Sequence, residues 1–513
     1  MKIILILLTA VLITLNVNAQ SAAWVSQGMA PRTERGNGIT HDNIDALYIT
    51  GPFLDSVRFN TFLLEESFGN YATQYDTLGE PVWAIENLGG DGVVFDGASS
   101  LYLIDNETKV LTKTGLNGTV IWSNALFTNS LFGSNGIQGV YATGTDVYVT
   151  GFYSGNAYFG TNDTLYNTNA GDASWDIFVV KLNSAGQFQW AATAGGAGLD
   201  KGYGIYADDA GNVYCTGYFK DNAMFESTAV TSNGGLHDVY IAKYSPSGTL
   251  LWVHTYGGTG FDLAAKIVED DNGHLYTTGR FNNEITFGST TLYSSGTDAF
   301  IIKFDADGNI LRAMGISGGG NDEEADLDYE DGNLVFIATT AGTVSINAAT
   351  HTGLGNLDIC LGKMDTTFTL LWSKLYGSSS NDEGSGIVLL NGSTYFTGSF
   401  NDVADFDGLQ LTAQGLWDIV TGKIDDDLTT GIETAVAEAG LTVYPVPVST
   451  VLSIETFSGK GIYELHDVTG KLVLGGTLNS TKFDLNVTEL KKGVYFLSVS
   501  DGDEVLRKKI SKQ

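Results

Sequence analysis

The stretch that decides the fold is Asp200–Trp252, which reads DKGYGIYADDAGNVYCTGYFKDNAMFESTAVTSNGGLHDVYIAKYSPSGTLLW. Runs rich in β-branched and aromatic residues, such as VYCTG and DVYIAK, alternate here with turns rich in Gly, Asn, Asp and Ser. These are the signals of short strands joined by tight turns. The same order of features recurs from about residue 22 to about residue 427, so one repeated unit organises most of the chain.

Three kinds of anchor residue define the repeat. An aromatic residue lies in a strand of the type Y-x-T-G, at Tyr48, Tyr102, Tyr148, Tyr214, Tyr276, Phe336 and Tyr395. A lysine ends a later strand, at Lys113, Lys181, Lys243, Lys303, Lys363 and Lys423, and Gln74 takes its place in the first copy. A tryptophan follows nine residues later, at Trp83, Trp122, Trp190, Trp252 and Trp372, with Arg312 in one copy. The last four lysines are 60 residues apart, a period typical of a propeller-like array.

The seven aromatic anchors and seven lysine positions predict an all-β fold, a seven-bladed β-propeller with four strands in each blade. The tryptophan series is one short at its C-terminal end, because no tryptophan follows Lys423. Trp24 supplies the missing member, since it precedes Tyr48 by 24 residues, which is the interval from Trp190 to Tyr214. We therefore predict that the N-terminal strand completes the last blade and closes the ring, which removes its open sheet edges.

The spacing within a blade also predicts an inserted hairpin. The connection between the second and third strands is long in six blades and short in the second, where 11 residues separate Tyr102 from Lys113. A phenylalanine lies 11 residues after the aromatic anchor in five copies, at Phe59, Phe159, Phe225, Phe287 and Phe406. We expect each to be the buried residue of an extra hairpin on the face where the long loops gather.

Three motifs carry a family resemblance: DNGHLYTTG at Asp271–Gly279, DAFIIK at Asp298–Lys303, and Gly257-Gly258 after Trp252. With them, residues 22–427 resemble the β-propeller repeat family of secreted bacterial proteins. This resemblance implies a fold and carries no fixed catalytic residues.

The first residues predict export. Residues 1–19 combine a basic Lys2, an apolar run at Ile3–Leu15 and a small-residue end, which is the pattern of a secretory signal peptide cleaved before Gln20. Other apolar runs are too short to span a bilayer, so we expect no transmembrane segment.

The net charge limits the classes of possible partner, and the positions of the cysteines predict whether they form a disulfide. A net charge of −33 argues against nucleic acid and against anionic lipid, both of which need a basic surface. The two cysteines, Cys215 and Cys360, occupy strand positions that are apolar or aromatic in other copies. This placement predicts two buried free thiols rather than a disulfide.

The chain changes character after the repeat. Residues 428–440 form an acidic and then small-residue linker, and residues 441–513 contain short alternating strands with turns at Gly470 and Gly493. The latter pattern predicts a small Ig-like β-sandwich. The predicted parts are thus a signal peptide at 1–19, a propeller at 20–427, the linker, and a C-terminal secretion or sorting domain at 441–513.

The C-terminal segment resembles the sorting domain of the type IX secretion system of Bacteroidota-like bacteria. Nine positions carry the resemblance: Tyr444, Pro445, Pro447, Asp467, Gly470, Gly493, Tyr495, Lys508 and Lys509. Val446 departs from the usual asparagine between the prolines. The resemblance implies passage through the type IX translocon, removal of the domain by a sortase-like peptidase, and attachment to surface lipopolysaccharide or release. We expect a protein of the outer-membrane surface or the extracellular space. An ordinary Ig-like ligand-binding module is the alternative interpretation.

An acidic residue recurs ten residues after the tryptophan position, at Glu34, Asp200, Asp262, Asp322 and Asp382. These carboxylates precede the innermost strands and would lie at the channel mouth, where they would bind a cation or a sugar. Alternatively, each carboxylate accepts hydrogen bonds from the amides of Gly-rich loops and joins one blade to the next. The sequence leaves both interpretations open.

Residues that break the repeat are the other candidates for a ligand site. Trp175, His237 and Trp417 directly precede the aspartate of the third strand, where other copies have Thr297 or Leu357. Tyr153 is a further unrepeated aromatic residue. Aromatic rings with nearby carboxylates suit sugar binding. Extra packing of the inserted hairpins would explain the same residues.

No catalytic constellation is visible in the sequence. The six histidines have no zincin spacing, and neither a G-x-S-x-G elbow nor a phosphate loop occurs in a strand-to-helix context. The segment Asp305–Asn309 resembles the start of a calcium loop, but it lacks the twelfth-position carboxylate and occupies a turn of the repeat. We therefore predict no cofactor and no metal site, calcium having no support beyond this turn.

The sequence favours an exported, non-catalytic binding scaffold for a glycan or protein ligand. One alternative is a polysaccharide-degrading enzyme on the same fold, whose candidate acids would be Glu65, Glu66, Glu226 and Glu284. The other is a purely structural surface protein.

Overall fold

The structure is a computed structural model. It describes residues 21–127, 134–159, 163–166, 174–320, 322–323, 326–425, 441–444, 450–456, 461–467, 471–478, 480–488, 490–491, 493–500 and 505–512. Every regular element in these ranges is a β-strand. The chain divides into two compact units, Met1–Asp427 and Leu428–Gln513. The predicted signal peptide and the linker at 428–440 lie outside the described residues.

The described residues of the first unit contain seven groups of four consecutively paired antiparallel strands, which we call blades 1 to 7, and some of these groups are joined to further strands in larger sheets. Blade 1 contains β2 (Gly38–His41), β3 (Ala46–Phe59), β4 (Phe62–Asp76) and β5 (Pro81–Glu86), and blade 2 contains β6 (Gly92–Phe95), β7 (Ser100–Asp105), β8 (Val110–Gly115) and β9 (Val120–Ala125). Blade 3 contains β10 (Asn135–Ala142), β11 (Asp146–Tyr153), β14 (Asp176–Asn183) and β15 (Phe188–Gly196), and blade 4 contains β16 (Lys201–Ala207), β17 (Val213–Phe219), β20 (Asp238–Tyr244) and β21 (Leu250–Tyr256).

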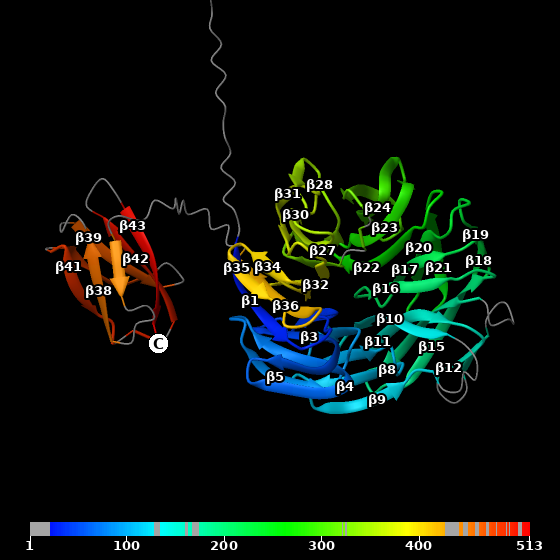
Figure 1. Ribbon diagram of the computed structural model, residues 1–513, viewed down its shortest axis with the longest axis horizontal. Coiled ribbons are helices and arrows are strands. Elements are labelled where there is room, and N and C mark those ends of the chain that lie inside the picture. The colour runs from blue at the N-terminus through cyan, green and yellow to red at the C-terminus, as the bar shows by residue number, and fades with distance from the viewer. Residues whose placement is uncertain are drawn as a thin grey trace, which may run out of the picture. The chain divides into compact units, whose positions relative to one another are not determined.

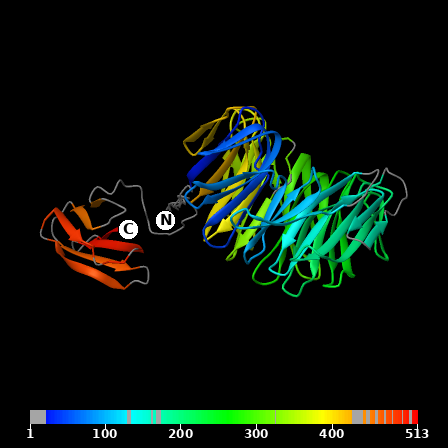
Figure 2. The same ribbon diagram turned by 90° about the horizontal axis from the view of Figure 1, so that it is seen from below.

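The remaining blades follow the same order. Blade 5 contains β22 (Leu263–Glu269), β23 (Leu275–Phe287), β24 (Thr290–Phe304) and β25 (Ile310–Ser317), and blade 6 contains β26 (Asp326–Glu330), β27 (Asn333–Thr340), β30 (Asp358–Asp365) and β31 (Leu370–Tyr376). Blade 7 contains β32 (Glu383–Leu390), β33 (Ser393–Phe400), β36 (Asp418–Ile424) and β1 (Ala22–Met29). The first strand of each blade contacts that of the next, and β32 contacts β2, so the fold is a closed β-propeller. Figure 1 shows the blades following one another around the ring from blue through cyan and green to yellow, and Figure 2 shows the blue and yellow strands of the first and last blades together in a view turned by 90°.

The N-terminal strand closes the ring, as predicted. β1 pairs antiparallel with β36, and Trp24 lies directly opposite Lys423. Figure 1 shows the dark blue β1 beside the yellow β36. The same strand also pairs with β3 of blade 1 through Gly28 and Phe59, so the first and last blades share one continuous sheet.

The anchor residues lie side by side across three strands of a blade. In blade 4, Tyr214 is opposite Lys243, which is opposite Trp252, and the Lys243 ammonium lies 4.9 Å from the centre of the Tyr214 ring. Lys243 Nζ also donates to the carbonyl of Ala306 at 3.1 Å, in a turn of blade 5. The anchors therefore pack each blade against its neighbour.

The aromatic anchor predicted for blade 6 is wrong by one residue. Val335, and not Phe336, lies opposite Lys363. The buried residue 11 positions after Val335 is Ile346, which takes the place of the usual phenylalanine. Because side chains alternate between the two faces of a strand, this one-residue shift moves Phe336 to the other face.

The predicted hairpins are present, and those of blades 4 and 6 pair with the last strand of the preceding blade. β18 (Asn222–Phe225) and β19 (Thr228–Thr231) form a hairpin in which Phe225 lies opposite Ala194 of blade 3. Phe59, Phe225, Phe287 and Phe406 are buried, while the side chain of Phe159 lies outside the described residues. The other separate hairpins are β12 (Asn156–Phe159) with β13 (Asp163–Tyr166), β28 (Val344–Ile346) with β29 (Ala349–His351), and β34 (Val403–Phe406) with β35 (Leu409–Thr412).

Cys215 and Cys360 are buried free thiols, as predicted. Burial raises the pKa of Cys215 to about 11, which keeps the thiol protonated at neutral pH. In the described ranges, no helix is long and apolar enough to cross a membrane.

The second unit contains two antiparallel sheets. One consists of β37 (Leu441–Tyr444), β38 (Val451–Thr456) and β41 (Lys482–Asn486), and the other of β39 (Gly461–Asp467), β40 (Leu472–Leu478), β42 (Gly493–Ser500) and β43 (Val505–Lys512). Leu452 and Ile454 of the first sheet share one core with Leu465 and Leu497 of the second, as expected of the predicted β-sandwich.

The predicted sorting positions are distributed over this sandwich. Tyr444 ends β37, Asp467 ends β39, Gly493 and Tyr495 lie on β42, and Lys508 and Lys509 lie on β43. The Tyr495 hydroxyl donates to the carbonyl of Lys491 at 2.8 Å. Pro445, Pro447 and Gly470 lie outside the described residues.

Candidate functional site

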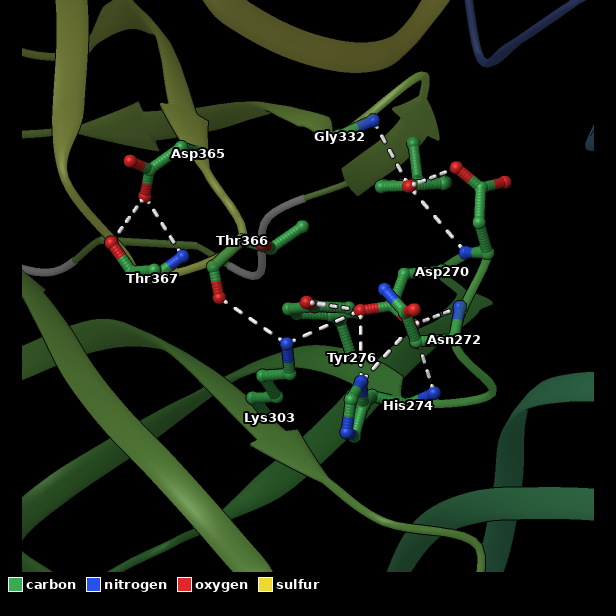
Figure 3. A network of polar contacts seen from close by, with 11 residues as sticks. Asp270, Asn272, His274, Tyr276, Lys303, Gly332, Asp365, Thr366 and Thr367 are labelled. Atoms are coloured by element: carbon green, nitrogen blue, oxygen red, sulfur yellow. Dashed lines mark hydrogen bonds and ion pairs between the residues drawn. The ribbon is translucent and has the colours of Figure 1, made fainter.

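Polar groups on the short-turn face hold the turns of the propeller together. The Asp270 carboxylate accepts hydrogen bonds from the main-chain N–H of His274, the Tyr276 hydroxyl and Lys303 Nζ (Figure 3). Burial alone would raise the pKa of Asp270, but these hydrogen bonds lower it to about 2. Lys303 Nζ also donates to the Thr366 carbonyl of blade 6 at 3.3 Å, so the network joins two blades.

The calcium-like segment is a turn of the same kind. Asp305 Oδ1 accepts the N–H groups of Asp307 at 3.0 Å and Asn309 at 2.9 Å, so the carboxylate caps its own turn as predicted. Among the described residues, no group of three His, Cys, Asp or Glu side chains comes together in a way that could hold a metal ion.

Pairs of buried carboxylates lie below the long-loop face, at five junctions between blades. Each pair joins one of the predicted loop acids to the aspartate that begins a third strand, giving Asp200 with Asp176, Asp262 with Asp238, Asp322 with Asp298, Asp382 with Asp358, and Glu34 with Asp418. All of these side chains are buried. These carboxylates therefore lie beneath the surface of this face.

Asp262 shows how such a carboxylate joins two blades. Its Oδ2 accepts the N–H of Gly258 at 2.9 Å, in the loop that leaves blade 4. Its Oδ1 accepts the N–H of Asn282 at 3.2 Å, on blade 5. Asp200 accepts N–H groups from blades 3 and 4 in the same way, at Gly196 and Lys220. These contacts match the second interpretation of the acidic series, in which each carboxylate joins neighbouring blades.

Burial raises the pKa of the loop acids because a charged carboxylate is poorly solvated there. The pKa of Asp200, Asp262 and Asp322 rises to about 7, and the charge of the paired aspartate adds to the effect of burial. The pKa of Glu34 rises to about 8, through burial first and the charge of Asp418 second. These pairs therefore carry less than their full negative charge at neutral pH.

The residue before each third-strand aspartate has a constant main chain and a variable side chain. Its carbonyl accepts the N–H of the loop acid at 2.8–3.2 Å, in the pairs Trp175 with Asp200, His237 with Asp262, Thr297 with Asp322, Leu357 with Asp382 and Trp417 with Glu34. Since this hydrogen bond does not involve the side chain, each blade can present a different side chain at the same place.

In blades 3 and 4, these side chains, Trp175 and His237, belong to a continuous row of aromatic and cationic groups that extends into blade 5. We call it the mouth track, and it consists of Trp175, Phe152, Lys201, Tyr203, Tyr218, His237, Phe261 and Arg280. Phe152 and Tyr218 are 9% and 6% exposed and form its base, while the other six side chains are half-buried. The mouth track lies on the face of the long loops, where the first strands begin.

The blade 3 end of the mouth track is built around Lys201. The rings of Trp175 and Phe152 have their centres 4.5 Å apart. Lys201 Nζ lies 4.9 Å from the centre of the Phe152 ring and 4.6 Å from that of Tyr203. Both distances are within the range of cation–π contacts.

The blade 4 and 5 end is built around His237. The His237 ring lies 4.5 Å from Tyr218 and 4.6 Å from Phe261, measured between ring centres. Arg280 Cζ lies 5.6 Å from the centre of the Phe261 ring. Burial, with the nearby charge of Lys220, lowers the pKa of His237 to about 4, so the imidazole packs as a neutral ring at pH 7.

A hollow of about 500 Å³ adjoins the Arg280 end of the mouth track. Its lining combines an aromatic ring, a guanidinium group, an amide, a hydroxyl and carboxylates, from Phe261, Arg280, Asn282, Thr297, Asp322, Glu323 and Leu357. The volume is within the usual range of small-ligand pockets, about 300–1,000 Å³. Asp322 is thus a member of the acidic series that borders this hollow.

Other predicted site residues lie elsewhere. Trp417 forms a separate cluster at the junction of blades 7 and 1, where Arg35 Cζ is 5.4 Å from its ring centre and Arg35 Nη1 is 2.6 Å from Glu383. Tyr153 is fully buried, and its hydroxyl lies 2.6 Å from Thr193 Oγ1. Of the predicted aromatic candidates, the mouth track contains Trp175 and His237.

Sequence reasoning missed six members of the mouth track, namely Phe152, Lys201, Tyr203, Tyr218, Phe261 and Arg280. A signal for three of them is available in the repeat. Phe152, Tyr218 and Arg280 each lie opposite the second residue of a third strand, where blades 6 and 7 have Thr339 and Ser399. A comparison of the copies at this position would have identified the row, because the residue type changes there from blade to blade.

The first strands enclose a central channel of about 480 Å³. One position of these strands is glycine in five blades, at Gly38, Gly92, Gly139, Gly204 and Gly386. In blades 5 and 6 the same position is Lys266 and Asp326, whose charged groups are 3.2 Å apart. An ion pair between neighbouring blades therefore replaces a close approach of two main chains.

The acids considered for catalysis occupy the inserted hairpins of three blades. Glu65 and Glu66 lie on β4, Glu226 lies between β18 and β19, and Glu284 lies on β23. Glu226 Oε1 accepts the N–H of Leu250 at 2.7 Å.

The C-terminal residues match a known family. Residues 442–513 match the family described as "Secretion system C-terminal sorting domain". The C-terminal sandwich is therefore a type IX sorting domain, as its motifs indicated. The protein is handled by the type IX secretion system and is delivered to the cell surface or the extracellular space.

The chain also has more distant likenesses. The chain is 27% identical over 151 residues to the "Uncharacterized WD repeat-containing protein L264" of Acanthamoeba polyphaga mimivirus, which is 27% of this chain and 11% of that protein. It is 26% identical over 137 residues to the "Regulatory protein FlaEY" of Caulobacter vibrioides, which is 26% of this chain and 14% of that protein. The matches thus span less than a sixth of these relatives' own length.

Among solved structures, the chain is similar to virginiamycin B lyase from Staphylococcus aureus. The TM-score is 0.40 at 8% identity, over 78% of this chain and 99% of that chain.

Proposed function

We propose that the protein is a non-catalytic binding protein of the cell surface or extracellular space, whose propeller binds a glycan at the mouth track. The observation that supports this proposal is the continuous row of buried and half-buried rings from Trp175 to Phe261, beside a hollow of about 500 Å³. Aromatic faces pack against the apolar faces of sugar rings, and nearby amide and hydroxyl groups bond to sugar hydroxyls.

The distribution of side chains supports a ligand-binding role for this face. The main-chain hydrogen bond of the repeat needs only the carbonyl of Trp175 or His237, and the residue in that place is Leu357 in blade 6 and Trp417 in blade 7. Blades 6 and 7 have Thr339 and Ser399 where blades 3 and 4 have Phe152 and Tyr218. Aromatic groups therefore gather in blades 3 to 5 beyond what the closure of each blade requires.

Catalysis is the alternative function. A glycoside hydrolase needs two carboxyl groups that face the scissile bond from opposite sides. The paired carboxylates of the described long-loop face are buried, and Asp200 and Asp262 already accept two main-chain N–H groups each. A binding role uses the side chains that reach the surface, and we favour it for this reason.

Glycan-array binding by the exported chain tests the proposal, with Trp175→Ala and Phe261→Ala as site variants. Both variants should weaken binding at least tenfold, because each removes one ring of the row. Tyr293→Ala is the matched control, since Tyr293 is an exposed aromatic residue (72%) on the hairpin of β23 and β24. Equal binding by all three variants would rule out the mouth track, and turnover of a polysaccharide would contradict the non-catalytic role.

We also propose two partners from the C-terminal domain. A sortase-like peptidase would remove the domain after export, and surface lipopolysaccharide would then anchor the propeller. Mass spectrometry of the surface form tests both, because it should show a new C-terminus near the linker that carries a lipopolysaccharide adduct.

A further inference from the structure

Asp322 differs from its equivalents in the way its carboxylate is hydrogen-bonded. In Asp200 and Asp262, one oxygen accepts the N–H of the residue four positions earlier in the chain, and the other accepts an N–H of the following blade. Asp382 has the same two kinds of partner. At these three junctions, both carboxylate oxygens are therefore used in joining blades.

One oxygen of Asp322 is left without a donor. Its Oδ1 accepts the N–H of Ala341 at 2.9 Å, as the repeat requires. The residue four positions earlier is Gly318, and its N–H donates to Asp298 Oδ1 at 3.3 Å. Asp322 is 1% exposed, and its Oδ2 has no hydrogen-bond partner within the described residues. Because a buried oxygen without a donor is unfavourable, a ligand group that donates to it would stabilise this site.

The hollow of about 500 Å³ lies where blade 5 lacks the rings of blade 4. The residue whose carbonyl accepts the N–H of the loop acid is His237 in blade 4 and Thr297 in blade 5. The residue opposite the second position of the third strand is Tyr218 in blade 4 and Arg280 in blade 5. Thr297 and Arg280 line the hollow together with Phe261, so a ligand ring can lie where the repeat leaves out its own.

The charges that line the hollow disfavour a charged ligand of either sign. The carboxylates of Asp322 and Glu323 repel an anion, and the guanidinium of Arg280 repels a cation. A sugar hydroxyl carries no charge, and it can donate to a carboxylate oxygen while the C–H groups of the sugar ring lie against an aromatic face. An uncharged pyranose therefore fits both the polar and the apolar groups of this lining.

We propose that Asp322 makes this site selective for uncharged sugars, whose hydroxyl donates to Asp322 Oδ2 while the sugar ring lies in the hollow beside Phe261. This inference rests on the proposed function, because it names the ligand class of the same site. The rest of the glycan extends from Phe261 along the rings of the mouth track. A sugar that brings a carboxylate or an ammonium group into the hollow binds more weakly, because its charge meets a like charge there.

Matched oligosaccharide pairs test this selectivity with the exported full-length chain, by isothermal titration calorimetry. Hexasaccharides of cellulose, galactan and mannan are each compared with the form oxidised at the primary hydroxyl, which carries carboxylates. Chitin hexasaccharide is compared with its deacetylated, cationic form. The uncharged member of at least one pair should bind at least tenfold more tightly. If the charged member binds as tightly or more tightly in the pairs that bind, the inference is overturned.

Asp322→Asn tests whether this carboxylate is the origin of the selectivity. The asparagine oxygen keeps the N–H of Ala341, so the NH₂ group takes the place of Oδ2 and donates instead of accepting. Binding of the uncharged member should weaken at least tenfold, and its advantage over the oxidised member should fall below threefold, because one carboxylate of the hollow is gone. Asp382→Asn is the matched control, since both oxygens of Asp382 already accept N–H groups, and it should leave this advantage unchanged.

The outcomes separate this inference from the proposed function. Equal binding of charged and uncharged members, lost in Phe261→Ala, would overturn the selectivity and leave glycan binding at the mouth track intact. Failure of every oligosaccharide and every arrayed glycan to bind would overturn both proposals. An undiminished advantage in Asp322→Asn would overturn the role of Asp322. Circular dichroism and thermal unfolding check that each variant folds, and the oligosaccharide pairs decide the selectivity without any variant.

Discussion

Trp24 lies directly opposite Lys423 in the antiparallel pair of β1 and β36, although the two residues belong to opposite ends of the propeller's sequence. The indole Nε1 donates to the Thr77 carbonyl of blade 1 at 3.1 Å. The ring also lies against Gly79, where an added Cβ would come within 2.7 Å of it. One residue thus joins the last blade to the first.

We expect Trp24→Ala to lower the free energy of unfolding by about 2 kcal/mol, less than the loss of about 3–5 kcal/mol for a fully buried aromatic side chain. Urea denaturation followed by tryptophan fluorescence measures this change. Leu78→Ala is the control in the same turn, because Leu78 is 77% exposed, and it should change stability little. Similar losses in both variants would show that closure does not depend on the indole.

Stability should fall as the pH rises from 5.5 to 8.5. The pKa of Asp322 is about 7 in the folded protein, above its ordinary value of 3.8, because burial disfavours the charge. The folded state therefore binds the proton more tightly, and this stabilisation, complete below the ordinary pKa, is lost as the pH rises through 7. The contribution of one such group is about 2 kcal/mol over this interval.

Asp322→Asn tests the origin of that pH dependence. The asparagine oxygen can still accept the N–H of Ala341, which Asp322 Oδ1 accepts at 2.9 Å. Urea denaturation at pH 5.5 and pH 8.5 should show a smaller difference in this variant than in the natural protein. Asp307→Asn, on an exposed turn, should leave the difference unchanged. An undiminished difference in Asp322→Asn would assign the effect to other groups.

The ion pair between Lys266 and Asp326 should contribute modestly to the packing of blades 5 and 6. Lys266 is 46% exposed to the channel, so solvent screens the attraction, and we expect a coupling energy of about 1 kcal/mol in a double-mutant cycle with alanine. The coupling should decrease in 1 M salt. A coupling of zero at low salt would mean that the two side chains only fill space.

The two thiols should be unreactive in the folded protein. Cys215 and Cys360 are buried, and burial raises the pKa of both thiols, to about 11 for Cys215. Ellman's reagent should therefore detect no thiol in native buffer and two in denaturant. Rapid reaction in native buffer would indicate that these blades open.

Deletion of residues 441–513 should leave the propeller in the periplasm, because the sorting domain directs passage across the outer membrane. Fractionation and surface proteolysis of cells that carry the truncated gene measure the location. The natural chain, examined in the same way, should be accessible to the protease. Surface display of the truncated chain would contradict this role.

The propeller and its closure were predictable because the anchors recur at fixed intervals and strand pairing preserves register. Trp24 completes the tryptophan series, and it lies opposite Lys423 as Trp252 lies opposite Lys243. Phe336 shows the limit of this reasoning. An aromatic residue beside the true position is indistinguishable from an anchor until the pairing of Val335 with Lys363 is known.

The sequence by itself thus determined the repeat, the closing strand, the inserted hairpins and the sorting domain, all of which depend on residues a fixed distance apart. Only the tertiary structure decided that Asp200 and Asp262 lie beneath the surface, and that Lys201 lies between Phe152 and Tyr203. The physical reason is that the mouth track draws on loops and strands of three blades. Contacts between blades follow from how neighbouring sheets pack, and no spacing along the chain specifies them.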